Sequence, residues 1–221
     1  MKQYSNKIFI ACNYNNKKIK TQFDTLKKKI ERKFPYNCII IDKEKIHEAK
    51  DLWGKIKSEI KSSGICFFDV TGFRPNVVLE LGFALGITNS KEKKLFLTFH
   101  NRANGGSKPE WNLSDVTGLI RIPYNSSKQL EQHCLNQIKK LPFYDKIQYF
   151  NSLCKGKAGS YKKVGNMILL TLRDQGPKTY KQLEILSSKS YCRVDTLISM
   201  LKKSKLISKA RGPNGRISLI A

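Results

Sequence analysis

Short apolar runs alternate with longer stretches of helical periodicity over the first 125 residues of the chain. Buried strands are predicted at residues 7–12, 38–41, 65–70, 94–99 and 119–122. Amphipathic helices are predicted at residues 21–33, 48–62, 75–87 and 127–140. Strands that alternate with helices of this length favour an α/β fold, built on a doubly wound parallel sheet of the flavodoxin-like type.

The pattern changes after residue 149. Residues 155–163 are rich in glycine, serine and lysine, which is typical of a linker or of a solvated helix start. Helical periodicity returns at 164–174, 180–187 and 191–204, and two β-like arms then flank a turn at 212–215. Three short helices and a terminal hairpin predict a small C-terminal winged helix-turn-helix domain. We therefore expect two domains, residues 1–150 and residues 160–221.

Positive charge is the most unusual feature of the composition. The 221 residues include 42 Lys and Arg against 17 Asp and Glu, a formal net charge of +25. Residues 151–221 hold 15 of the basic and 3 of the acidic side chains, so charge density is highest there. An excess of this size favours nucleic acid as a partner, DNA more than RNA, although a lysine-rich solvated surface would look the same.

The winged-helix interpretation assigns candidate nucleic-acid contacts to the last helix and the hairpin. Early residues of a recognition helix reach base edges, whereas later lysines and hairpin cations suit phosphates. Winged helices also serve as protein-interaction modules, so that alternative stays open. The candidates are Tyr191, Arg193, Thr196, Lys202, Lys203, Lys209, Arg211 and Arg216.

Several classes of protein fit the sequence poorly. A hydrophobic content of 40% is enough for a packed core, and no apolar run approaches the length of a membrane span. The 6 cysteines are scattered without a CxxC pair, which fits free thiols in the cytoplasm. The three histidines have no metal-ligand spacing, and no phosphate-binding glycine motif occurs. We expect no metal, no cofactor and no membrane partner.

The segment 69–86, DVTGFRPNVVLELGFALG, carries the candidate chemistry. Ligands of open parallel sheets bind beyond the carboxyl ends of the strands, and Asp69 ends the third predicted strand. Side chains on a helix lean toward its N-terminus, so Glu80 is expected to point back to that strand end. A poorly solvated carboxylate beside a second one suits a nucleophile or a cation stabiliser. The alternative makes Glu80 a surface residue and Asp69 a cap.

This segment resembles the signature of nucleoside 2-deoxyribosyltransferase-like and TIR-like nucleotide-binding domains, over roughly residues 5–140. The resemblance implies that Glu80 attacks the anomeric carbon of a nucleoside or steadies the ribosyl cation as nicotinamide leaves NAD. Asp69 would orient the sugar or help to protonate the leaving base. Asn76 would bind a ribose hydroxyl and Arg74 a phosphate, although Arg74 stands where the signature often has Asn. NAD would therefore be a substrate, not a cofactor.

Further substrate contacts are expected around the same strand ends. Thr71 lies in the loop after the third strand, Asn13 and Tyr14 follow the first strand, and His100 ends the fourth. Tyr14 is placed to stack on a base, although an exposed turn aromatic is the commoner case. A lone histidine in a loop is more often incidental than catalytic.

The pairing of such a domain with a winged helix resembles retron-associated and other bacterial antiphage effectors. The leading hypothesis is an N-glycosidase or NADase coupled to nucleic-acid binding, either as a homo-oligomer or within a defence complex. One alternative is a non-catalytic transcriptional regulator that senses a nucleotide. Another is a scaffold for a ribonucleoprotein.

Overall fold

A computed structural model describes residues 7–41, 49–87, 93–101, 119–157, 160–187, 192–209 and 216–219. The described chain divides into two compact units, with Lys7 to Asn136 in one unit and the residues from Gln137 onward in the other. This division falls earlier than the domain boundary expected from the sequence. The two units are described separately.

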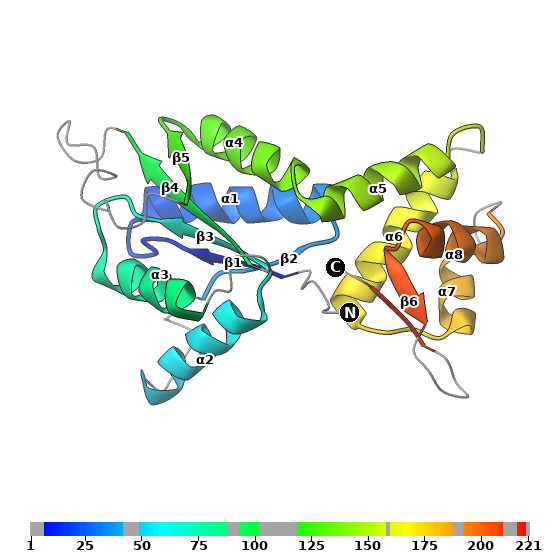
Figure 1. Ribbon diagram of the computed structural model, residues 1–221, viewed down its shortest axis with the longest axis horizontal. Coiled ribbons are helices and arrows are strands. Elements are labelled where there is room, and N and C mark those ends of the chain that lie inside the picture. Colours follow the sequence, from blue (N-terminus) through cyan, green and yellow to red (C-terminus); the bar gives the residue numbers. More distant parts are fainter. Residues whose placement is uncertain are drawn as a thin grey trace. The chain divides into compact units, whose positions relative to one another are not determined.

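The N-terminal unit is an α/β domain with a central parallel sheet, as the sequence predicted (Figure 1). Its strands are β1 (Lys7–Ala11), β2 (Asn37–Ile39), β3 (Ile65–Asp69), β4 (Lys94–His100) and β5 (Ile120–Tyr124). They follow the order β2-β1-β3-β4-β5, and every neighbouring pair is parallel. This order is consistent with a flavodoxin-like fold, and it reverses direction between β1 and β3.

Helices cover both faces of this sheet, α1 and α4 on one and α2 and α3 on the other (Figure 1). Their bounds are α1 (Lys17–Lys33), α2 (Ala49–Ser62), α3 (Pro75–Ile87) and α4 (Ser127–Lys139). Because both faces are buried, the central strands are apolar at successive positions, and all five residues of β3 are buried. No helix in the described part of the chain combines the length and apolar character that crossing a membrane requires.

Helix α1 begins four residues earlier than the periodicity predicted, and its cap explains the difference. The side chain of Asn16 accepts hydrogen bonds from the backbone N–H groups of Lys18 and Ile19, at 3.1 and 3.3 Å. Asparagine is a favoured N-cap because this geometry satisfies N–H groups that lack a partner within the helix. The buried positions Phe23, Leu26 and Ile30 follow the expected face.

The C-terminal unit contains helices and a short antiparallel pair of strands. Its elements are α5 (Pro142–Leu153), α6 (Ser160–Gln175), α7 (Tyr180–Ser187), α8 (Val194–Lys203), β6 (Ile207–Lys209) and β7 (Ile217–Leu219). The sequence analysis did not predict α5, although Pro142 at its first turn is a recognised start signal. The start of α6 at Ser160 agrees with the solvated helix start that was one of two alternatives for residues 155–163, whereas α8 begins later than predicted.

Apolar side chains of α7 and α8 contribute to the core of this unit. Leu183, Leu197 and Leu201 are fully buried, and Val194 and Ile198 nearly so. Helices α5 and α6 approach closely at Gly165, where an added Cβ would lie 2.2 Å from the ring of Phe150. Only glycine permits that approach without a shift in the packing.

Backbone pairing joins the segment before α7 to the strand pair. Lys178 and Ile217 exchange two backbone hydrogen bonds, at 3.0 and 2.7 Å. The chain order is therefore helix, bridge, helix, helix and two strands, with the bridge residue paired to the last strand. The turn expected at 212–215 lies outside the described residues.

Candidate active site

A pocket of about 300 Å³ lies at the carboxyl end of β1, one of the two strands between which the strand order reverses. Its volume is near the lower end of the range of about 300–1,000 Å³ that is usual for small-molecule sites. Its position is the one where open α/β sheets bind their ligands. The residues that line it are Phe9, Ile10, Ala11, Cys12, Asn13, Tyr14, Asn15, Ile40, Ile41, Ile56, Arg74, Pro75, Asn76, Val77 and Glu80.

The loop between β3 and α3 adopts an unusual backbone that directs the helix at this pocket. Gly72 has a φ of 71° and Phe73 a φ of 45°, and the N–H of Phe73 donates to Val70 O at 3.0 Å. Glycine adopts such a φ freely, but a bulky residue does so only under constraint, which is common at functional sites. Pro75 then starts α3, and the positive end of the helix faces the pocket rim.

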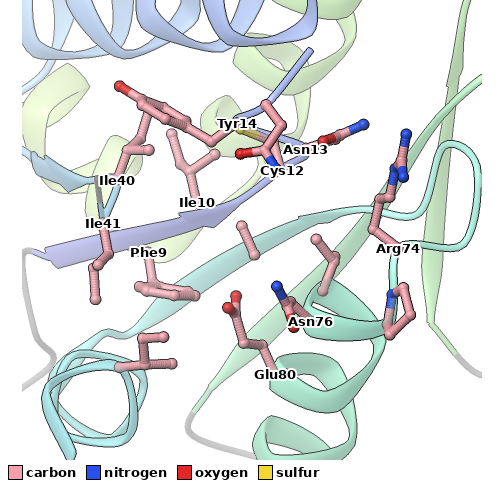
Figure 2. Close-up of a pocket in the computed structure, with 15 residues that line it drawn as sticks. Phe9, Ile10, Cys12, Asn13, Tyr14, Ile40, Ile41, Arg74, Asn76 and Glu80 are labelled. Carbon is pink, nitrogen blue, oxygen red and sulfur yellow. The ribbon is translucent and has the colours of Figure 1, made fainter. Parts of the chain in front are cut away.

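Glu80 and Asn76 reach from α3 toward the end of β1 (Figure 2). They lie one helical turn apart and so share a side of the helix. Glu80 is 8% exposed, and the other buried residues of α3 are all apolar. It contributes the one carboxylate among the residues that line the pocket. Glu80 was expected to point back to the end of the third strand beside Asp69; it instead lines a pocket at the end of β1 that does not include Asp69.

Asn13 and Arg74 form the polar rim of the pocket. With the amide of Asn13 oriented so that its oxygen faces the guanidinium, it accepts from Arg74 Nε at 2.8 Å and from Nη2 at 3.3 Å. Arg74 is the one cationic side chain among the lining residues, and it is exposed. These two hydrogen bonds hold the guanidinium in place through Nε and Nη2. The remaining edge of the guanidinium faces solvent, where an anionic group can bind.

Tyr14 lies beside this rim and contacts residues of α1. Its hydroxyl donates to Asp24 Oδ1 at 3.4 Å, and the ammonium of Lys20 lies 4.2 Å from the ring centroid. These contacts hold the ring at the pocket wall, where the sequence analysis expected an aromatic contact to the base.

Cys12 lines the pocket but was not predicted from the sequence. Burial raises the pKa of its thiol, and the negative charges of Asp69, Asp24 and Glu80 raise it further. Cys12 therefore lies close to both candidate carboxylates and stays protonated at neutral pH, which makes it a poor nucleophile. Nothing in the sequence pattern distinguished it from the other buried cysteines.

Asp69 lies outside the pocket lining, in a buried polar cluster at the ends of β3, β4 and β5. It is 0% exposed, and its Oδ1 accepts from the hydroxyls of Thr71 at 2.8 Å and of Thr98 and Tyr124 at 3.3 Å. The other oxygen, Oδ2, has no hydrogen-bond partner among the described residues. Burial raises the pKa of Asp69 to about 7, against the lowering effect of these hydrogen bonds.

Thr71 and His100 belong to this buried cluster and do not line the pocket. The backbone N–H of His100 donates to Thr71 Oγ1 at 2.8 Å, so the threonine proton is directed to Asp69. The ring of His100 packs edge-on against Tyr124, with centroids 5.2 Å apart. The structure thus separates the predicted residues into two groups, and Asp69 acts on the pocket only through its neighbours.

An apolar floor completes the pocket, and the sequence analysis did not identify it. Ile40 and Ile41 follow β2, Ile56 comes from α2, and Phe9 and Ile10 come from β1. Ile40 and Ile41 belonged to a predicted strand, and only the strand order places them beside β1. A flat apolar surface facing a carboxylate suits a ring-shaped ligand with a polar end.

In the C-terminal unit, the predicted nucleic-acid contacts fall on one helix and the strand pair. Arg193 is exposed at the N-cap of α8, Lys202 and Lys203 are exposed in its last turn, and Thr196 is half-buried. Arg216 is exposed before β7, and Lys209 ends β6. Tyr191 and Arg211 lie outside the described residues.

The first turn of α8 also carries an acidic group. Asp195 accepts a hydrogen bond from the Tyr180 hydroxyl at 2.7 Å, and this bond raises the pKa of Tyr180 to about 12. The start of α8 therefore exposes one cation, Arg193, and one carboxylate, Asp195. Its attraction for phosphate is weaker than the sequence indicated.

No protein-family model matches this chain, and a search of curated proteins finds no similar sequence. Within the described ranges, no three His, Cys, Asp or Glu side chains are grouped as a metal site would require.

Proposed function

We propose that the N-terminal unit is an N-glycosidase that releases the base from NAD or from a nucleotide. The observation that carries this proposal is the Glu80 carboxylate, almost buried, at an apolar pocket where the sheet order reverses. Cleavage of an N-glycosidic bond develops positive charge on the sugar, and a close carboxylate in a poorly solvated site is suited to stabilise it.

In this mechanism the bond between C1′ and the base nitrogen breaks, and the base departs with the bonding electron pair. Glu80 either forms a bond to C1′, which breaks again when water adds there, or holds the cation until water adds. Nicotinamide leaves NAD as a neutral base, so the proton lost by the water goes to solvent, whereas the base of a nucleotide leaves as an anion and takes up a proton. Asn76, one turn before Glu80, is placed to bind a ribose hydroxyl. The apolar floor of Ile40, Ile41 and Ile56 offers a surface for a ring.

Arg74 favours a substrate that carries phosphate. Its guanidinium is braced by Asn13 at the rim and lies at the positive end of α3. Guanidinium groups bind phosphate through paired hydrogen bonds, and helix N-termini favour anions. We therefore place NAD and nucleoside monophosphates ahead of free nucleosides as substrates.

The test is a mass-spectrometric assay for free base. Full-length wild type, Glu80→Gln and a matched control, Glu59→Gln, are incubated with NAD, nucleosides and nucleoside monophosphates of both sugars, with and without DNA. Glu59 lies in α2, pairs with Lys7 at the surface, and does not line the pocket. We expect base release by wild type and by the control only. Equal release by Glu80→Gln and wild type would exclude the proposal.

We further propose that the C-terminal unit is a winged helix-turn-helix module that couples this activity to DNA. The order of helix, bridge, helix, helix and strand pair supports this proposal, as do the exposed cations Arg193, Lys202 and Arg216. If DNA binding at one site is retained by Glu80→Gln and no substrate releases its base, the protein is instead a nucleotide-sensing regulator.

A further inference from the structure

Helix α1 carries more net charge than any other helix that the structure describes. Its 17 residues include eight basic and two acidic side chains, a net charge of +6. The next most basic described helices, α2 and α6, have a net charge of +2 each, and α8 has +1. The strongest cluster of positive charge on a single helix therefore lies on the N-terminal unit, outside the predicted DNA-binding helix.

Four of these cations share one exposed side of the helix, which we call the α1 stripe: Lys17, Lys18, Lys28 and Arg32. All four are exposed. At 3.6 residues per turn they fall within an arc of about 100° on the helix side opposite the buried residues. Within the described residues no carboxylate pairs with any of the four.

The two acidic side chains of α1 do not neutralise the stripe. Asp24 is half-buried and accepts a hydrogen bond from the Tyr14 hydroxyl. Glu31 accepts one from the backbone N–H of Cys38 at 3.0 Å. Between the stripe cations the exposed positions are Thr21 and Thr25, whose hydroxyls bond to the helix backbone. The stripe is therefore uniformly positive.

Helix stability does not account for the N-terminal part of the stripe. Lys17 and Lys18 lie in the first turn, which contains no acidic residue. The positive end of the helix dipole disfavours cations there, by about 0.3–1 kcal/mol each. Arg32 in the last turn is favoured by the same dipole. The lysines at the start of α1 therefore lower the stability of the helix slightly.

The chemistry of the stripe fits a phosphate backbone better than a membrane. From Lys17 to Arg32 the helix extends about 22 Å, which is enough to face several successive phosphates. Helices that bind membrane surfaces insert an apolar face, whereas Ile19, Phe23 and Leu26 of α1 are buried in the core of the unit. No apolar side chain interrupts the exposed face.

We infer that the α1 stripe is a nucleic-acid-binding surface that contacts phosphates without reading base sequence. It lies on the same unit as the pocket and is distinct from the predicted contacts of α8. The inference does not depend on the proposed glycosidase activity, and it holds whether or not Glu80 is catalytic.

The test measures binding of full-length protein to a fluorescein-labelled 30-base-pair duplex by anisotropy, from low to high salt. The stripe variant carries Lys18→Gln, Lys28→Gln and Arg32→Gln, which preserve helix propensity. We expect affinity at least about tenfold weaker near 0.1 M salt. We also expect the slope of log K against log salt to fall by about 2–3, since each lost phosphate contact contributes about 0.9.

A matched control removes the same charge elsewhere on the unit, through Lys55→Gln, Lys61→Gln and Lys94→Gln. These lysines are exposed, and they lie on α2 and at the start of β4. We expect the control to bind like wild type, apart from a small general effect of net charge. Equal weakening in both variants would attribute binding to diffuse charge and overturn the inference, as would unchanged binding in the stripe variant.

Two further measurements test whether binding depends on charge and whether the ligand is nucleic acid or lipid. Replacing Lys18 and Lys28 by Arg should restore wild-type binding, because the charge returns. Vesicles with an acidic lipid test the membrane alternative. If the stripe variant loses vesicle binding but retains duplex binding, the surface binds lipid and the inference is wrong.

Discussion

Two polar regions border the same short segment of chain, and they differ in almost every physical respect. The pocket region contains Glu80, Asn76 and Arg74, and opens to solvent at the end of β1. The cluster around Asp69 is closed, and its threonine and tyrosine partners are nearly or fully buried. Only eleven positions separate the two carboxylates in the sequence.

The comparison shows how the surroundings of a carboxylate determine its role. Asp69 is surrounded by donors and apolar atoms and cannot be reached from the pocket, so it holds strand ends together. Glu80 is buried on α3 among the apolar residues Val77, Leu81 and Ala84, and its carboxylate lines a pocket. Two carboxylates in one motif thus take separate roles according to their surroundings. The predictions below test that separation.

The largest expected effect is on catalysis. Glu80→Gln should lower the rate of base release about a thousandfold or more, which is about 4 kcal/mol of transition-state stabilisation. Its thermal midpoint should change little, since the amide is similar in size to the carboxylate. Rates measured with saturating NAD and a melting curve on the same sample check both parts. Loss of folding instead of activity would assign Glu80 a structural role.

The second effect is a pH dependence of stability caused by Asp69. Its pKa in the folded protein is about 7, above the ordinary value of 3.8, so folding favours the protonated form. The associated stability is complete below about pH 4, and is lost as pH rises to about 7. Because one pKa unit corresponds to about 1.4 kcal/mol, the loss over this range is about 4 kcal/mol.

Asp69→Asn is the variant that isolates this dependence, since it cannot titrate. Urea unfolding at several pH values between 4 and 8 should show wild type losing stability relative to the variant as pH rises. A difference that does not vary with pH would mean that Asp69 titrates near its ordinary value. Base release by Asp69→Asn at pH 5 should remain measurable, which separates it from Glu80→Gln.

The sequence predicted the sheet and the position of Glu80 better than the surroundings of either carboxylate. Alternating runs and helical periods depend on local contacts, so the five strands and the four helices of the N-terminal unit were identified with small errors at their ends. The helical lean of side chains was enough to direct Glu80 at the strand end. Both inferences use short-range geometry alone.

What the sequence could not predict depends on pairings between distant strands. Asp69 pairs with Thr98 and lies beside Tyr124, and those contacts follow from the order β3-β4-β5. The same applies to Ile40, which the order β2-β1 places under the pocket. Strand order becomes visible only in three dimensions.

A third prediction concerns Tyr124, whose hydroxyl donates to Asp69 Oδ1. Tyr124→Phe should lower the free energy of unfolding by about 1–2 kcal/mol near pH 8, where the acceptor is charged, and by less near pH 5. Base release should stay within a few-fold of wild type. The exposed Tyr149 provides the control Tyr149→Phe, expected to be neutral. A loss of activity at unchanged stability would show that the buried cluster takes part in catalysis.

The smallest effect separates backbone conformation from packing in the loop that joins the two regions. Gly72 has a φ of 71°, and an added Cβ would meet no atom within 4 Å, so Gly72→Ala should cost about 1 kcal/mol through backbone strain alone. Gly82, within α3, is equally open but has an ordinary helical backbone, so Gly82→Ala should stabilise by up to about 1 kcal/mol. Chemical unfolding of both variants measures the difference in sign. The same substitution should also affect substrate binding, because Gly72 lies two residues before Arg74, which is proposed to bind phosphate. Gly72→Ala should therefore raise KM for a phosphorylated substrate more than it lowers kcat. An identical effect of the two substitutions would show that the loop relaxes freely and does not hold the pocket rim in place.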